Sequence, residues 1–302
     1  MSGGARLGPR VALRDIEQVA AGIDHAEGIC RTPDGTVYVS GEKGQLYRVE
    51  DDGSATEVAS TGGWTLGLAS DAGGRIYACD AVHHAVLRWT PVAGDPVAWS
   101  HGAPEAPFRT PNWGAFGPDG SFFVSDSGAW KGRDGNIQVV RGGVTSVWTG
   151  EPVDFPNGLA VTPDGAELWV LESTPGRLVA FDIRADGSAG PGRVLADLPG
   201  SVPDGIAFAT DGSILIACYR PDVVYRWRAD LGLEVVAEDP EGTVLAAPTN
   251  CAFVGPDLDV IAVPNIGRWH VSRFRVPGLA GAPLFYPTAA QLGEGAAHEV
   301  RA

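Results

Sequence analysis

A short motif that returns six times is the feature that most constrains this chain. Its clearest copy, residues 156–172, contains an asparagine, a short apolar strand, a Pro-Asp-Gly turn and a second strand. Proline presets φ at a turn, and Asp-Gly supplies the positive-φ position that a tight hairpin needs. The copies start near positions 27, 66, 112, 157, 204 and 250, at spacings of 39, 46, 45, 47 and 46 residues. A period in the forties that is built from short strands indicates a β-propeller.

A third strand follows the hairpin in every copy, and a fourth follows it in most copies. In the fourth copy these strands are residues 177–181 and 192–196. Six units of four strands predict an all-β, six-bladed β-propeller with four-stranded blades, in a single domain over residues 1–302. The 42 glycines and 23 prolines agree with a fold that is rich in turns. We expect residues 16–20, ahead of the first copy, to form the outer strand of the last blade, because closing the ring removes an open sheet edge.

Composition narrows the classes of partner. The chain has a formal net charge of −15, which disfavours nucleic acid and anionic membrane surfaces as partners. No run approaches the roughly 20 apolar residues of a membrane span, and residues 1–14 hold no apolar core of a signal peptide. These patterns predict a cytoplasmic protein that acts on a small molecule. The four cysteines form no Cys-x-x-Cys pair, so we expect buried free thiols.

A column of polar residues precedes the innermost strands. The equivalent positions are Glu27, Leu66, Asn112, Asn157, Asp204 and Asn250. Innermost strands line the channel of a propeller, so equivalent ends meet at one mouth of it. Asparagine and aspartate are also ordinary turn residues before a strand. That interpretation explains one or two positions more easily than five oxygen-bearing side chains in register.

The donor set of this column suits a hard cation. Two carboxylates and several amide oxygens favour Ca²⁺, with Mg²⁺ or Mn²⁺ as alternatives. No histidine or cysteine lies in the column, which disfavours structural zinc, although Zn²⁺ in an open oxygen-rich site stays an alternative. The sequence therefore predicts one divalent metal ion.

The motifs resemble those of the senescence-marker-protein/gluconolactonase/luciferin-regenerating-enzyme family, which includes regucalcin. The resemblance runs from about residue 24 to residue 278, through Ala26-Glu27-Gly28, Phe155-Pro156-Asn157-Gly158, Pro203-Asp204-Gly205, Thr249-Asn250 and Val276-Pro277-Gly278. It implies that Glu27, Asn157 and Asp204 bind one divalent metal and that Asn112 contacts the ligand or its water. It also implies hydrolysis of a lactone or similar ester.

Two departures from that pattern lie on the substrate side. Family members often have Asp after the third-unit Asn, where this chain has Trp113, and many sugar-lactone members have Arg at the position of Thr110. Arg109 stands one residue further away. These departures put a sugar-acid lactone in doubt and favour a more apolar or aromatic ligand. We expect Arg109, Trp113, Trp130 and His25 to contact substrate, with Trp130 on a long loop, residues 127–135, that acts as a lid or is a solvated insertion.

The sequence thus predicts a lactonase or esterase, a carboxylic-ester hydrolase in which the metal polarises the carbonyl and activates water. Asp204 is expected to act as ligand and general base, and Asn112 to orient the water or the oxyanion. The alternative is a non-hydrolytic propeller. It would be a metal- or ligand-binding protein, or an enzyme recruited to a biosynthetic cyclisation or condensation, as in the distantly similar strictosidine-synthase group.

Overall fold

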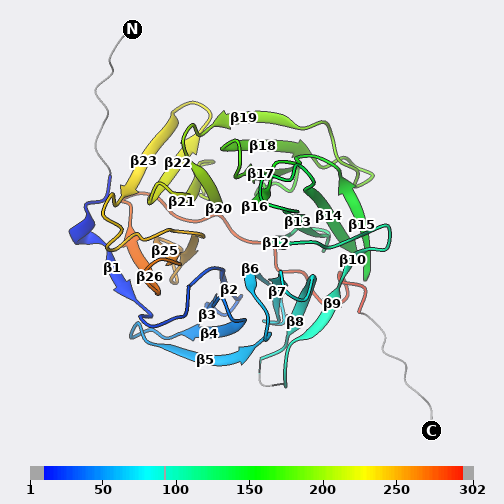
Figure 1. Ribbon diagram of the computed structural model, residues 1–302, viewed down its shortest axis with the longest axis horizontal. Coiled ribbons are helices and arrows are strands. Elements are labelled where there is room, and N and C mark those ends of the chain that lie inside the picture. Colours follow the sequence, from blue (N-terminus) through cyan, green and yellow to red (C-terminus); the bar gives the residue numbers. More distant parts are fainter. Residues whose placement is uncertain (1–9, 92, 295–302) are drawn as a thin grey trace.

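The computed structural model describes residues 10–91 and 93–294, and it shows six four-stranded sheets arranged around a central channel (Figure 1). Blade 1 consists of β2 (Ile29–Arg31), β3 (Val37–Ser40), β4 (Gln45–Val49) and β5 (Ala55–Ser60). Blade 2 consists of β6 (Thr65–Ser70), β7 (Ile76–Asp80), β8 (Ala85–Trp89) and β9 (Val97–Ser100). Blade 3 consists of β12 (Pro111–Phe116), β13 (Phe122–Asp126), β14 (Asn136–Arg141) and β15 (Val144–Thr149).

The second half of the ring repeats this arrangement. Blade 4 consists of β16 (Pro156–Val161), β17 (Glu167–Glu172), β18 (Arg177–Asp182) and β19 (Arg193–Asp197). Blade 5 consists of β20 (Val202–Phe208), β21 (Ile214–Arg220), β22 (Val223–Arg228) and β23 (Gly232–Glu238). Blade 6 consists of β24 (Ala252–Val254), β25 (Val260–Asn265), β26 (His270–Arg275) and β1 (Glu17–Val19). These sheets confirm the predicted all-β six-bladed propeller. A short hairpin, β10 (Gly102–Ala103) and β11 (Ala106–Pro107), and a 3₁₀ turn (Leu13–Asp15) complete the regular elements.

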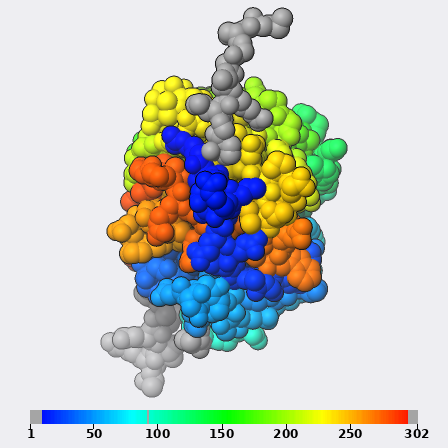
Figure 2. All heavy atoms as spheres, turned by 90° about the vertical axis from the view of Figure 1, so that its left-hand side faces the viewer, coloured from blue at the N-terminus to red at the C-terminus, as the bar shows by residue number. Residues whose placement is uncertain are grey.

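The N-terminal strand closes the ring, as the sequence predicted. Strand β1 pairs antiparallel with β26, and Val19 lies opposite Val271. Just before it, the backbone N–H of Val11 donates to the carbonyl of Val236 in blade 5, at 2.9 Å. Figure 2 shows this N-terminal segment in blue, packed between parts of the chain coloured orange and yellow. The last blade therefore has no open outer edge on β26.

The repeated turn works through its aspartate. In blade 4, Asp164 accepts hydrogen bonds from the Thr162 hydroxyl at 2.6 Å and from the Ala166 N–H at 3.1 Å. These hydrogen bonds, with that from Thr162 the larger cause, lower the pKa of Asp164. Gly165 follows with a φ of +74°, a conformation that residues with a side chain rarely adopt. The turn chemistry therefore fixes each inner hairpin locally.

A glycine after the polar column lets the inner strands approach one another. A Cβ atom on Gly158 would lie 2.2 Å from the carbonyl oxygen of Asp204 in the next blade. A Cβ atom on Gly28 would lie 2.0 Å from the carbonyl oxygen of Leu66. Only glycine tolerates so close a neighbour. The column residues consequently converge on the axis.

The segment that follows blade 6 crosses the ring instead of forming another strand. Figure 1 shows this coil, coloured from orange to red, running through the centre of the view from the left-hand blades to the right-hand ones. The Ala282 N–H donates to the Phe208 carbonyl of blade 5 at 2.9 Å, and the Tyr286 hydroxyl donates to the Arg31 carbonyl of blade 1 at 2.8 Å. No repeat is visible in the sequence of this segment, and the crossing was not predicted. Within the described ranges, no helix is both long and apolar enough to cross a membrane.

Candidate metal centre

Four of the predicted site residues stand at the starts of neighbouring or facing inner strands. Glu27, Asn112, Asn157 and Asp204 are 9%, 6%, 5% and 8% exposed, respectively. The fold thus removes two carboxyl groups and two amides from water at one end of the channel. Burying such groups is costly unless something pairs with them.

The two carboxyl groups oppose each other's ionisation. Burial raises the pKa of Asp204 to about 8. A hydrogen bond from the Asn157 amide lowers this pKa, but its effect is smaller than that of burial. Burial also raises the pKa of Glu27 well above its usual range, and the charges of Asp204 and then Glu42 add to that effect. Glu27 and Asp204, far apart in sequence, are therefore close enough to interact.

Serine side chains fix the orientation of both asparagines. The Ser173 hydroxyl donates to the carbonyl of Pro203 in blade 5 at 2.7 Å, so it accepts from Nδ2 of Asn157, at 3.2 Å. Ser127 accepts from Nδ2 of Asn112 in the same way, at 3.0 Å. Because each amide nitrogen is held by a serine, the orientation of each amide is set by hydrogen bonding and Oδ1 stays free to accept.

These serines were missed at the sequence level, although a signal existed. Ser127 and Ser173 each follow an acidic residue that ends a second strand, in adjacent copies of the repeat. The acidic residues themselves hold loops. Asp126 accepts from the N–H of Thr110 at 2.6 Å, and Glu172 accepts from the N–H of Asp154 at 3.1 Å. That role agrees with the turn function expected of such positions.

The unpaired polar atoms support a cation. Seven buried side-chain nitrogen or oxygen atoms have no hydrogen-bond partner within the part of the chain that the structure describes, and three of them belong to the column. Two of these three are acceptors, Oε2 of Glu27 and Oδ1 of Asn157. Two buried carboxyl groups and one amide oxygen, with an unpaired acceptor on Glu27 and on Asn157, fit a hard divalent cation. Glu27, Asn157 and Asp204 are the residues that could hold it.

Arg109 and Trp130 lie at the rim of this end of the channel. Arg109 forms an ion pair with Asp134 of the 127–135 loop, and its side chain is 57% exposed. Trp130, in the same loop, is 50% exposed and packs edge-to-face on Phe155, with ring centroids 4.9 Å apart. Arg133 ties the loop to Asp154 at 2.9 Å. The loop is thus fastened to blade 4, and a substrate contact by Arg109 or Trp130 stays a prediction.

His25 belongs to a second polar group at the mouth. Its Nδ1 lies 2.7 Å from Asp24 and 2.9 Å from Glu42, and its ring packs against Trp269 in a tilted arrangement with centroids 4.9 Å apart. The side chains of Asp24, His25 and Glu42 lie close enough together to bind one cation. However, Lys43 already forms an ion pair with Asp24 at 3.1 Å. His25 thus contacts Asp24 and Glu42 through Nδ1, and a substrate contact by His25 stays a prediction.

Trp113 packs into the apolar core, and a substrate contact by this residue stays a prediction. Its side chain is 9% exposed and packs with Phe123, Trp148 and Leu159 in the apolar core that blades 3 and 4 share. Trp113 therefore contributes to the core between these blades, and it also borders the channel.

Comparisons with known proteins agree with this fold. The family model described as the SMP-30/Gluconolactonase/LRE-like region matches residues 25–264. A gluconolactonase structure from Xanthomonas campestris has a TM-score of 0.74 at 19% identity, over 87% of this chain and 89% of that one. Regucalcin from Agrobacterium tumefaciens, a calcium-binding protein, gives 0.71 at 19% identity, over 89% and 96%.

A more distant structure carries a different activity. Virginiamycin B lyase from Staphylococcus aureus gives a TM-score of 0.61 at 15% identity, over 91% of this chain and 90% of that one. No curated protein matches the sequence. Structural similarity at 15–19% sequence identity establishes the fold, and the reaction must be inferred from the site residues.

Proposed function

Because the chain belongs to the SMP-30/gluconolactonase/LRE-like family, we propose that it is a divalent-metal-dependent hydrolase of a lactone or a related ester. The main support for the proposal is that two buried acceptors, Oε2 of Glu27 and Oδ1 of Asn157, have no hydrogen-bond partner among the described residues. The buried carboxyl group of Asp204 belongs to the same column. Ca²⁺ suits this oxygen set best, and Zn²⁺, Mn²⁺ and Mg²⁺ are alternatives. The substrate is a small molecule, and we place the protein in the cytoplasm.

The roles of the residues follow from their positions. A divalent cation in such a site supplies polarisation of the ester carbonyl and greater acidity of an attacking water. Glu27 balances its charge. Asp204 takes the proton of the water as the oxygen adds to the carbonyl carbon, and it returns a proton to the ring oxygen when the carbon–oxygen bond breaks. Asn112, oriented by Ser127, donates its remaining N–H to the substrate.

The mouth supports an apolar substrate. Trp64, Trp130 and Trp269 are 38%, 50% and 47% exposed, and each lies in a loop on the face where the column begins. The charged rim residues Arg109 and Arg133 are already paired with carboxylates of the protein. Exposed aromatic rings offer apolar contact area to an aryl or alkyl substituent.

The experiment that tests the proposal is metal analysis followed by a lactone panel. We expect about one divalent ion per chain, and hydrolysis that chelation abolishes and metal restores. Aromatic and alkyl lactones should be better substrates than glucono-lactone. A protein that binds the metal yet hydrolyses no lactone or ester would show that the hydrolase proposal is wrong and would favour the non-hydrolytic alternative. A protein that binds no divalent ion would refute the metal centre itself.

A further inference from the structure

An apolar cavity of about 360 Å³ occupies the channel below the polar column. That volume lies within the range of small-molecule sites, roughly 300–1,000 Å³. Its space arises from small side chains on the inner strands of five blades. These are Ala69, Ala115, Ala160, Ala207 and Ala252. No aspartate or glutamate belongs to the lining, and Arg31, at the outer end, is the charged residue in it.

Asn250 gives this cavity one unsatisfied hydrogen-bond donor. The side chain is 1% exposed, and its Oδ1 accepts from the backbone N–H of Cys251 at 2.7 Å, which fixes the orientation of the amide. Its Nδ2 has no hydrogen-bond partner anywhere in residues 10–91 and 93–294. Asn250 is also the column residue that lines the cavity. An unpaired buried donor costs free energy that a suitable acceptor would recover.

Both hydroxyl groups of the lining are engaged, whereas Nε of Arg31, at the outer end, is a second donor without a partner among the described residues. The Tyr286 hydroxyl donates to the Arg31 carbonyl at 2.8 Å, and the Ser70 hydroxyl donates to the Asp71 carbonyl at 3.3 Å. A stable buried water needs two to four polar partners, so the single donor at the Asn250 end, in apolar surroundings, holds water poorly. The cavity therefore suits an apolar body that carries one acceptor.

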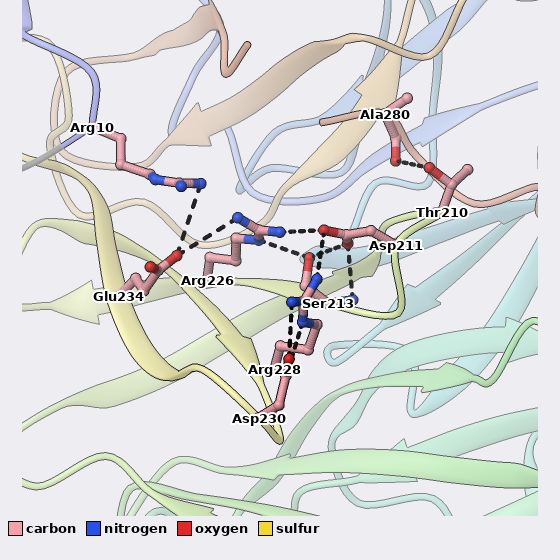
Figure 3. Close-up of polar contacts among 9 residues, drawn as sticks. All are labelled: Arg10, Thr210, Asp211, Ser213, Arg226, Arg228, Asp230, Glu234 and Ala280. Atoms are coloured by element: carbon pink, nitrogen blue, oxygen red, sulfur yellow. Dashed lines mark hydrogen bonds and ion pairs between the residues drawn. The ribbon is translucent and has the colours of Figure 1, made fainter. Parts of the chain in front are cut away.

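A strap of the chain, residues 282–286, covers the cavity. It is anchored at blade 5, where Thr210 donates to the Ala280 carbonyl through its N–H at 2.9 Å and its hydroxyl at 3.3 Å (Figure 3). Figure 3 shows this anchor beside the ion-pair network of Asp211 and Arg226 in the same blade. Between the Ala282 N–H and the Tyr286 hydroxyl, no hydrogen bond holds the strap among the described residues, and Leu284 is 60% exposed. The strap can therefore move without breaking a strand.

We propose that this cavity is a second binding site, for a small neutral molecule with an apolar body and a single hydrogen-bond acceptor, such as a medium-chain alcohol, ketone or ester. The alanine-lined wall takes the apolar body, and Nδ2 of Asn250 donates to the acceptor. The net charge of −15 disfavours an anionic ligand, and the positive charge of Arg31 in the lining disfavours a cationic one. The site lies below the metal centre and does not depend on the hydrolase proposal.

The test uses 1-hexanol, hexane and hexanoate as probes, on metal-loaded and on chelated protein. Calorimetry should show that 1-hexanol binds with the same affinity in the presence and absence of metal. Its affinity should exceed that of hexane by roughly 2- to 10-fold, which corresponds to the contribution of one hydrogen bond. Hexanoate should bind more weakly than 1-hexanol. A crystal soaked with 6-bromo-1-hexanol should place the bromine in the cavity. Tighter binding of hexanoate would instead assign the site to carboxylates held by Arg31, and would overturn the neutral ligand.

Two substitutions separate the wall from the donor. Ala160→Phe fills the cavity and should abolish 1-hexanol binding, whereas Asn250→Leu should keep binding but remove the preference for 1-hexanol over hexane. Ala115→Phe is the second filling variant if Ala160→Phe does not fold. The proposal is refuted if 1-hexanol fails to bind, if bromine occupies only the mouth above the metal centre, or if a folded filling variant binds as the natural protein does. Loss of hydrolysis with intact 1-hexanol binding would affect the proposed function alone.

Discussion

The two ends of the channel are built by the same six inner strands and have opposite chemistry. At one end, Glu27, Asn157 and Asp204 bring buried carboxyl and amide oxygens together. Three residues further along their strands, Ala160 and Ala207 leave an apolar space. With a rise of about 3.3 Å per residue, the two levels are roughly 10 Å apart. One repeated scaffold therefore carries two environments, which differ through single side chains at fixed positions of the repeat.

Asp204→Asn should have the largest effect at the polar end of the channel and no effect at the apolar end. Removing the proposed general base should lower kcat by about 10²- to 10⁴-fold, and removing a charge should weaken metal binding. Binding of 1-hexanol should not change, because Asp204 does not line the cavity. Steady-state kinetics and calorimetry measure the two effects. Asp257→Asn, at an exposed turn, is the matched control. Full activity of metal-loaded Asp204→Asn would show that Asp204 is not the general base.

The metal-free protein should lose stability as pH rises. Burial raises the pKa of Asp204 from 3.8 to about 8, so between these values the folded state binds more protons than the unfolded state. The free energy of unfolding then falls across this window, on the order of a few kcal/mol. Urea unfolding of chelated protein from pH 4.5 to 8 measures it, and Asp204→Asn should show a smaller slope. Stability that rises over the same window would contradict the burial of an unpaired carboxyl group.

Gly158→Ala tests how tightly the column is assembled. The added methyl group would meet the Asp204 carbonyl oxygen at 2.2 Å, so the strands must separate at a cost of about 1–3 kcal/mol. Metal affinity should fall as well, because Asp204 moves with its backbone. Gly150→Ala, where a Cβ atom would meet no neighbour within 4 Å, is the control. Equal urea midpoints for the two variants would show that the inner strands are free to adjust.

Glu294→Gln should have the smallest effect, and only at the apolar end. Glu294 pairs with Arg75 and Arg88 of blade 2, at the end of the segment that carries the strap. Partly exposed pairs of this kind contribute about 0–1 kcal/mol to stability. We expect faster association of 1-hexanol by stopped-flow mixing, with kcat unchanged. Glu241→Gln, at an exposed position, serves as the control. An unaltered association rate would mean that the strap does not gate the cavity.

Much of the fold could be predicted because its signals are local. The Pro-Asp-Gly turn satisfies its own hydrogen bonds within five residues, as Thr162 and Asp164 show. The repeat then sets the number of strands, and a missing outer strand in the last blade implies closure by residues 16–20, where β1 forms at residues 17–19. Buried oxygens at Glu27 and Asp204 followed from register alone, since equivalent strand ends meet at one mouth.

What only the tertiary structure decided depends on residues far apart in the chain. Ser173 orients Asn157 because its hydroxyl is committed to the carbonyl of Pro203, 30 residues away. Trp113 faces the core because of the packing between blades 3 and 4, which its sequence neighbours do not specify. The cavity exists because alanines from five blades meet around one axis and a non-repeating C-terminal segment covers them. Sequence by itself determined the repeated hairpin and the oxygen column, whose causes lie within a few residues. The enclosed space between distant blades has no local cause, and it arises only when the ring closes.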